Sequence, residues 1–243
     1  MAQRSSRVRY LSIFSEEPQK LAAYYAQRFG FVEMARADSG DVSLTDGGIR
    51  LSIVRLRDSL GEVQMTAGPH HIGIDVESIE TIKARFRRLN PRGVVVPERG
   101  SQRGEVRLYD PECNPISLSS RGFGISGEPD APTCMRQIMI ETLDPAAQAN
   151  FYAAVFGFTP VPNPLAHRQG ARPDCSVSDG HIILTCRDFY GVTVGVSPRY
   201  GVSRCVIQPL ASAAADDGGR DPDGNQVTLP AGASREEHSL WRA

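Results

Sequence analysis

The sequence lacks the features that mark membrane, secreted and nucleic-acid-binding proteins. Among its 243 residues, no hydrophobic stretch approaches the ~20 residues that a membrane span needs. The first residues include arginine, but no hydrophobic segment follows them, so we expect no secretory signal. The 27 basic and 28 acidic residues give a formal charge of −1, which removes the broad electrostatic attraction of a general nucleic-acid binder.

Cysteines are few and are not arranged in pairs. The five of them are odd in number and widely spaced, at Cys113, Cys134, Cys175, Cys186 and Cys205. None of them forms the C-x-x-C spacing that is typical of a metal or redox motif. The pattern therefore predicts reduced thiols in a cytoplasmic protein and argues against a disulfide framework.

What the sequence does contain is a repeat. Residues 10–31 and 137–158 share one order: an apolar strand, an acidic residue, a proline, a helix with aromatic side chains, and Phe-Gly-Phe. Further along, Asp-Gly pairs recur before apolar strands, and the motif D-P-x-x-N begins at both Asp110 and Asp221. Finding the same elements twice in the same order indicates two homologous units.

The repeat divides the chain into two domains. We place the first at residues 1–123, a Gly/Pro-rich linker at 124–133 and the second domain at 134–243. A hydrophobic content of 40% is enough for each to build a core. Residues 204–221 of the second domain hold far fewer positions than residues 71–110 of the first, so the second domain is predicted to be shortened.

Local signals predict where helices and strands begin and end. Pro18 and Pro145 suit the first turn of a helix, and Gly30 and Gly157 suit the left-handed position that ends one. Alternating and apolar patterns predict strands at 49–54, 70–76, 115–119 and 181–186, and a helix at 78–89.

These motifs resemble the vicinal oxygen chelate superfamily, which includes glyoxalase I, bleomycin-resistance proteins and extradiol ring-cleavage dioxygenases. The resemblance rests on strand–acidic residue–helix–Phe-Gly-Phe, on H-x-x-I-x-V from His71, and on D-P-x-x-N, and it covers residues 8–123 and 134–230. It implies an α+β fold of tandem domains. Each domain would be built of paired βαβββ modules whose curved sheets form a cup, with the last module of the second domain shortened.

The resemblance also implies a metal site, because this family uses a divalent ion such as Fe, Zn, Mn or Ni in the cup. Its ligands come from four strand positions and are usually His, Gln or Glu. In the first domain these positions fall on Tyr10, Arg50, His71 and Ser117.

In the second domain the corresponding positions fall on Gln137, about Ile183, Arg204 and Thr228. Only His71 and Gln137 are ordinary ligand types, whereas an open catalytic site normally needs three anchored ligands and arginine repels a cation. A metal is therefore possible but not expected.

In this family, half-domains can also pair across domains, which gives two further candidate cups. One would hold His71, Ser117 and Gln137 as a weak metal site, with His70 as an additional candidate. The other would bring together two cations and two hydroxyl groups suited to an anion: Tyr10, Arg50, Arg204 and Thr228. His70 itself is expected to point to the opposite side of its strand, toward solvent.

Three functions remain open. The leading hypothesis is a protein that holds a small oxygenated, aromatic or acidic molecule in a cup with an eroded metal site, with Tyr10 and His71 as candidate catalytic groups. The alternative is a metal-dependent lyase, isomerase or ring-cleaving dioxygenase that uses His71 and Gln137. The third is a structural module whose cups are filled by side chains. We further expect a homodimer that covers sheet edges left by the shortened domain.

Overall fold

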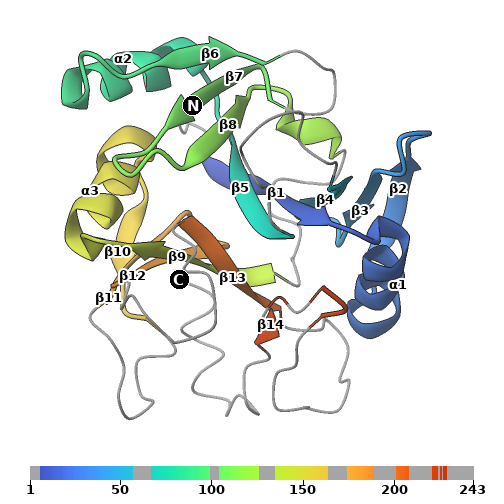
Figure 1. Ribbon diagram of the computed structural model, residues 1–243. Helices are drawn as coiled ribbons and strands as arrows, with labels where there is room; N and C mark the ends of the chain where they lie inside the picture. The colour runs from blue at the N-terminus through green and yellow to red at the C-terminus, as the bar shows by residue number, and fades with distance from the viewer. Residues whose placement is uncertain are drawn as a thin grey trace, which may run out of the picture.

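The chain folds into two β-sheets with a few helices, as the computed structural model in Figure 1 shows. The structure describes residues 6–56, 67–98, 104–125, 135–163, 174–188, 201–207, 221–223, 225 and 227–228. In these residues both sheets are mixed, with parallel and antiparallel neighbours. The predicted α+β class is confirmed.

Sheet A has eight strands in the order β2-β3-β4-β1-β5-β8-β7-β6. Its strands are β1 (Arg7–Ser15), β2 (Val32–Arg36), β3 (Val42–Thr45), β4 (Arg50–Arg55), β5 (Gly68–Asp75), β6 (Val95–Pro97), β7 (Val106–Tyr109) and β8 (Pro115–Ser119). The helices between them are α1 (Pro18–Phe29) and α2 (Ile79–Leu89), and a short 3-10 helix η1 (Gly122–Gly124) follows β8. The first and fifth strands pair at the centre, so strands β1 to β8 form one continuous sheet.

Sheet B repeats the first six positions of this order, as β10-β11-β12-β9-β13-β14. Its elements are β9 (Met135–Thr142), α3 (Pro145–Phe156), β10 (Thr159–Val161), β11 (Asp174–Ser178), β12 (Ile183–Asp188), β13 (Gly201–Ile207) and β14 (Val227–Thr228). Among the described residues, sheet B has no counterpart of α2, β6 or β7. The domain boundaries at 123 and 134 stay a prediction.

The helix ends follow the local signals in the sequence. Pro18 and Pro145 are the first residues of α1 and α3, where a missing N–H leaves no hydrogen bond unmade. Gly30 and Gly157 end these helices with φ of 75° and 77°, a conformation that favours glycine. The predicted starts and ends of these two helices are confirmed.

The repeat extends to irregularities in the strands. One extra residue is inserted in β1 at Arg9 and in β5 at His70, because the pairing register shifts there. Sheet B has the same two β-bulges, at Arg136 in β9 and at Ser203 in β13. A bulge turns the following side chains relative to the partner strand. The bulges in β5 and β13 come directly before two predicted site positions.

Each D-P-x-x-N turn joins the two halves of the molecule. Asp110 accepts hydrogen bonds from its own turn and, through its second oxygen, from the Tyr152 hydroxyl of α3 at 3.2 Å. Asp221 does the same with the Tyr25 hydroxyl of α1 at 3.1 Å. Because α1 and α3 lie on opposite sides of the molecule (Figure 1), these crossed bonds tie each half to the helix of the other.

The aspartates of the two Asp-Gly turns form a second crossed pair. Asp46 accepts from the backbone N–H of Met135 at 3.2 Å, and Asp179 accepts from that of Val8 at 2.6 Å. Each bond therefore fixes the start of the first strand of the other half. The repeated acidic motifs hold the fold together.

Helix α1 packs against one face of sheet A and leaves the other face polar. Alternation along β1 directs Leu11 and Ile13 toward the helix-covered core and directs Tyr10 and Ser12 to the opposite side. Strand β5 also lies beside β13 of sheet B. We call the face of sheet A that carries Tyr10 the inner face.

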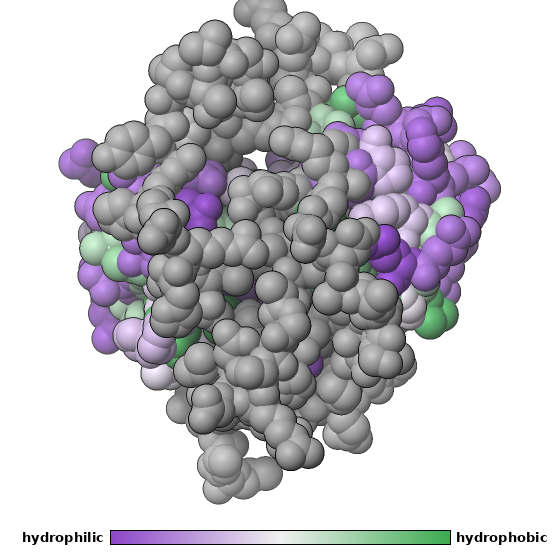
Figure 2. Space-filling view, turned by 90° about the horizontal axis from the view of Figure 1, so that it is seen from below, coloured by the Kyte–Doolittle hydropathy of each residue, from purple (hydrophilic) through white to green (hydrophobic). Residues whose placement is uncertain are grey.

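The described residues contain no helix of the length and apolar character that a membrane crossing needs. Seen from below, the described residues that remain visible are mainly hydrophilic, with isolated hydrophobic ones between them (Figure 2).

Candidate functional site

The inner face brings together the four site positions predicted in the first domain. Arg50 of β4 pairs with Tyr10 of β1, Tyr10 with Gly73 of β5, and Gly73 with Ser117 of β8. His71 lies two residues before Gly73 on β5, and its ring centroid is 5.4 Å from that of Tyr10. Residues paired in register share a face, so these side chains surround Gly73.

All four side chains are buried. Their exposed fractions are 1% for Tyr10, 4% for Arg50, 5% for His71 and 0% for Ser117. Within the described part of the chain, the Ser117 Oγ has no hydrogen-bond partner. A buried hydroxyl without a partner is unfavourable unless another group satisfies it, which makes this position a candidate contact for a ligand.

Arg50 is a buried cation at the edge of this group. Its Nη1 donates to the backbone oxygen of Phe123 at 3.1 Å and its Nη2 to Ser43 Oγ at 2.8 Å. Burial lowers the pKa of the guanidinium, although arginine stays charged in proteins. These two hydrogen bonds go to neutral groups.

His70 does not point to solvent, and that expectation was wrong. It is the extra residue of the bulge in β5, so its side chain no longer follows strict alternation. Its ring packs 4.5 Å from that of Phe14, and its Nδ1 lies 2.7 Å from Nδ1 of His71, so one of the two nitrogens donates to the other. Burial, and then the charge of Arg107, lowers the pKa of His70 to about 4, which keeps it neutral at pH 7.

The sequence reasoning missed an ion pair beside the same face. Arg107 of β7 pairs in register with Ser117, and its guanidinium lies 2.5 Å from Glu98, whose side chain is 8% exposed. A Cβ added to Gly104 would meet both the Glu98 carboxylate and Ser117 Cβ, so the ion pair lies next to the site. Alternation in β7 could have placed Arg107, but no local signal points to Glu98.

Gln137 lies in sheet B, apart from His71 in sheet A. It is fully buried, and its amide nitrogen donates to Asn163 at 3.1 Å and to Thr185 at 2.5 Å. Its Oε1 has no partner among the described residues. Each sheet joins its own strands, and the cross-domain cups stay a prediction.

The remaining predicted site residues are placed only by their backbone. Arg204 pairs with Met139 in β13, and Thr228 pairs with Val206 in β14. Their side chains lie outside the described part of the structure. Their roles stay a prediction.

The described donors on the inner face do not fit a divalent metal. His71 is a suitable ligand type and His70 lies beside it, but the other neighbours are the hydroxyls of Tyr10 and Ser117 and the cationic Arg50. In the described ranges, no three His, Cys, Asp or Glu side chains lie close enough together to hold an ion. A stable site needs more anionic or imidazole donors than these positions offer.

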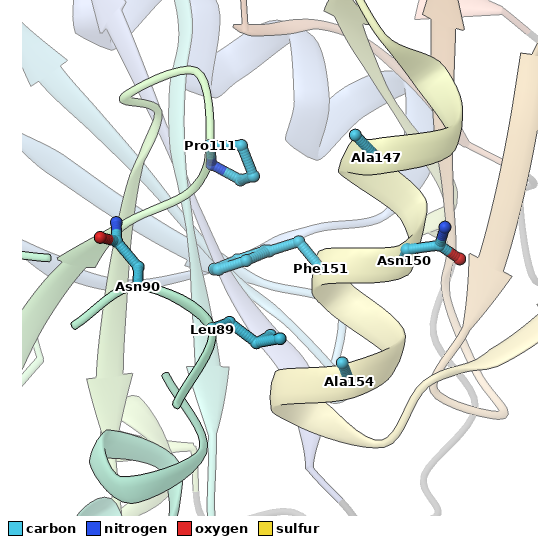
Figure 3. A pocket seen from close by; sticks show the side chains of 7 residues that line it. All are labelled: Leu89, Asn90, Pro111, Ala147, Asn150, Phe151 and Ala154. Atoms are coloured by element: carbon cyan, nitrogen blue, oxygen red, sulfur yellow. The ribbon is translucent and has the colours of Figure 1, made fainter. Parts of the chain in front are cut away.

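A separate cavity of about 480 Å³ lies between α2, α3 and the Asp110 turn. Figure 3 shows Phe151 reaching from α3 toward Leu89 and Pro111, while Asn150 points away. The lining holds no titratable group, so this cavity offers no chemistry of its own. The inner face remains the better candidate site.

Comparison with known proteins finds similar structures but no similar sequences. No family model and no curated protein matches the sequence. The 2,3-dioxygenase LapB from Pseudomonas sp. KL28 is similar in structure at 16% identity, with a TM-score of 0.63 over 92% of this chain and 91% of that one.

Two further solved structures agree. The Mn(II)-bound glyoxalase from Novosphingobium aromaticivorans has 12% identity and a TM-score of 0.66, over 93% of this chain and 82% of that one. The 2,2',3-trihydroxybiphenyl 1,2-dioxygenase from Sphingomonas wittichii strain RW1 has 12% identity and a TM-score of 0.61, over 93% and 90%. Extradiol dioxygenases and glyoxalases belong to the predicted superfamily, and the chain has the vicinal oxygen chelate fold.

Proposed function

We propose that this protein binds a small oxygenated organic molecule, aromatic or acidic, on the inner face of sheet A. The observation that carries the proposal is the buried polar group formed by Arg50, Tyr10, His71 and Ser117. Such a group offers a cation, hydroxyls and an imidazole within an otherwise apolar interior, which is the composition of a small-molecule site.

The chemistry of each residue assigns it a role. The Arg50 guanidinium would bind a carboxylate or phenolate oxygen, and the Ser117 hydroxyl would donate to a second oxygen. The Tyr10 ring offers an apolar surface for an aromatic ligand, and its hydroxyl could donate a hydrogen bond or act as a general acid. His71 lies beside the Tyr10 ring and could accept or return a proton.

Sheet B would carry a second, weaker site. The Oε1 of Gln137 is buried without a partner in the described residues, and Arg204 and Thr228 follow on the neighbouring strands. We propose that these residues contact the same class of ligand, and this proposal rests on their positions alone.

A thermal-shift screen with catechols, 2-oxo acids and aryl carboxylates tests the proposal on chelator-treated protein. A ligand that binds only the folded state raises the melting temperature, so at least one class should give a concentration-dependent rise. Replacement of Arg50 by Met, or of Ser117 by Ala, should weaken binding about tenfold, which corresponds to one lost hydrogen bond of about 1.4 kcal/mol. Arg55→Met is the matched control, because Arg55 lies exposed on the same strand.

Two outcomes would favour the other functions. If no ligand class shifts the melting temperature, the structural module with filled cups is the better interpretation. If protein purified without chelator carries a stoichiometric metal that His71→Ala removes, the metal-dependent lyase, isomerase or dioxygenase is favoured. Equal metal content in both samples would exclude His71 as a metal ligand.

A further inference from the structure

The segment after β8 occupies the centre of the inner face. The 3-10 helix Gly122–Gly124 directs the ring of Phe123 onto the ring of Tyr10, with 5.1 Å between centroids and 22° between planes. Phe123 is only 2% exposed. A Cβ on Gly73 would lie 2.5 Å from Phe123 Cζ, so the glycine in β5 makes room for the ring.

Polar contacts at both sides of the ring hold the same segment. Arg50 Nη1 donates to the Phe123 backbone oxygen at 3.1 Å. The backbone N–H of Gly122 donates to Asp75 Oδ1 at 3.2 Å. The segment therefore presents an aromatic ring and a carbonyl oxygen to the residues that we assign to ligand binding.

The backbone of this segment is unfavourable on its own. Gly122, Phe123 and Gly124 all have positive φ, of 70°, 57° and 73°. Glycine adopts this conformation readily, whereas phenylalanine rarely does and keeps it only where its surroundings enforce it. The contacts to Tyr10 and Arg50 are thus what holds Phe123 in place, and a ligand that takes over those contacts would release it.

We propose that Phe123 is an internal substitute for the ligand, and that the ligand is an aromatic carboxylate which displaces it. The ligand's ring would stack on Tyr10 over Gly73, and its carboxylate would replace the Phe123 carbonyl oxygen on Arg50. This inference rests on the proposed function and adds both the class of ligand and the step that opens the site.

The exchange is favourable on chemical grounds. One aromatic ring replaces another on Tyr10, so the stacking and the apolar burial are nearly unchanged. At Arg50, however, a neutral carbonyl oxygen gives way to a carboxylate, and hydrogen bonds between two charged groups are stronger than those to a neutral oxygen.

Calorimetric titration with benzoate tests the inference. Phe123→Ala removes the competing ring, so benzoate should bind at least tenfold more tightly than to the wild type, because apparent affinity falls with the fraction of open sites. Phe86→Ala is the matched control: Phe86 is similarly buried, at 1%, but belongs to α2 and packs against Phe151, so the affinity should not change. Adding Arg50→Met to Phe123→Ala should abolish the gain.

Hydrogen exchange of the wild type gives a second measurement that needs no variant. The Gly122 N–H and the Ile125 N–H are both hydrogen-bonded in this segment. Saturating benzoate should speed their exchange while it slows exchange in β1.

The two proposals fail in different ways. If benzoate binds the wild type and Phe123→Ala equally and leaves these two amides protected, the displacement is wrong but the ligand site stands. If toluene gains as much affinity as benzoate, Phe123→Ala has only opened an apolar cavity, and the carboxylate class is wrong. If neither benzoate nor any member of the wider screen binds either protein, both proposals are wrong.

Discussion

Gly73→Ala tests the packing at the centre of the inner face. The added Cβ would lie 2.5 Å from Phe123 Cζ and 2.7 Å from Tyr10 Cβ. Ordinary contacts between carbon atoms are about 3.5–4.0 Å, and overpacking of a core destabilises by about 1–3 kcal/mol. Because one of the two clashing atoms is a Cβ close to the backbone, which cannot rotate away, we expect the upper part of this range, measured by urea denaturation.

The double variant with Phe123→Ala separates the two contacts. Removing the ring alone should destabilise by about 3–5 kcal/mol, the usual range for a buried phenylalanine. In that background only the contact with Tyr10 Cβ remains, so Gly73→Ala should destabilise about half as much as in the wild type. The two substitutions should therefore show a coupling of about 1–2 kcal/mol, as neighbouring core residues do.

The control uses a glycine that is crowded by a different ring. A Cβ on Gly93 would meet the ring of Phe86, a residue of α2, and not Phe123. Gly93→Ala and Phe123→Ala should therefore destabilise additively. Additive effects for Gly73→Ala and Phe123→Ala as well would refute the contact between them.

Three further predictions concern the rest of the molecule. The folded-state pKa of His70, about 4, lies below its unfolded value of about 6.5, so His70 contributes stability above pH 6.5 that is lost as the pH falls toward 4. Allowing for its partial exposure, this contribution amounts to about 2 kcal/mol. In the His70→Gln variant, the free energy of unfolding from urea denaturation should therefore fall less between pH 7 and pH 4 than in the wild type. Tyr152→Phe and Tyr25→Phe each remove a buried hydrogen bond to an aspartate and should lower the free energy of unfolding by about 1.5 kcal/mol, whereas no change in urea denaturation would show that the crossed bonds are not stabilising. Light scattering should give twice the 26.4 kDa mass of the chain if the predicted homodimer forms, and the monomer mass would contradict it.

The sequence predicted the elements well because their signals are local. Proline at the first helical residue and glycine after the last one act within a single turn, and both helices begin and end there. The shortened second domain followed from the spacing of repeated motifs, and it stays a prediction.

The role of the repeated aspartates could not be predicted in the same way. Their spacing indicates a turn, and the turns are present. The second oxygen of each, however, binds a tyrosine on the other half of the molecule, 42 residues away for Asp110 and 196 for Asp221. A motif shows which groups are available, while the partner depends on how the two halves pack.

The inner face shows the same limit. The resemblance to the family placed Tyr10, Arg50, His71 and Ser117 at four strand positions, and the structure brings them together on neighbouring strands. The bulge that turns His70 inward cannot be recognised from the residue types, because a bulge arises from the pairing between two strands. Phe123 also went unnoticed, although a phenylalanine between two glycines is a pattern that a left-handed segment needs.

The central claim is that the inner face binds an oxygenated ligand through Arg50 without a metal. A crystal structure of chelator-treated protein with bound benzoate tests it most directly. We predict that the carboxylate lies within hydrogen-bond distance of Arg50, that the ring stacks on Tyr10, and that Phe123 has moved away. Benzoate bound elsewhere, or an ion coordinated by His71 at the same face, would contradict this claim.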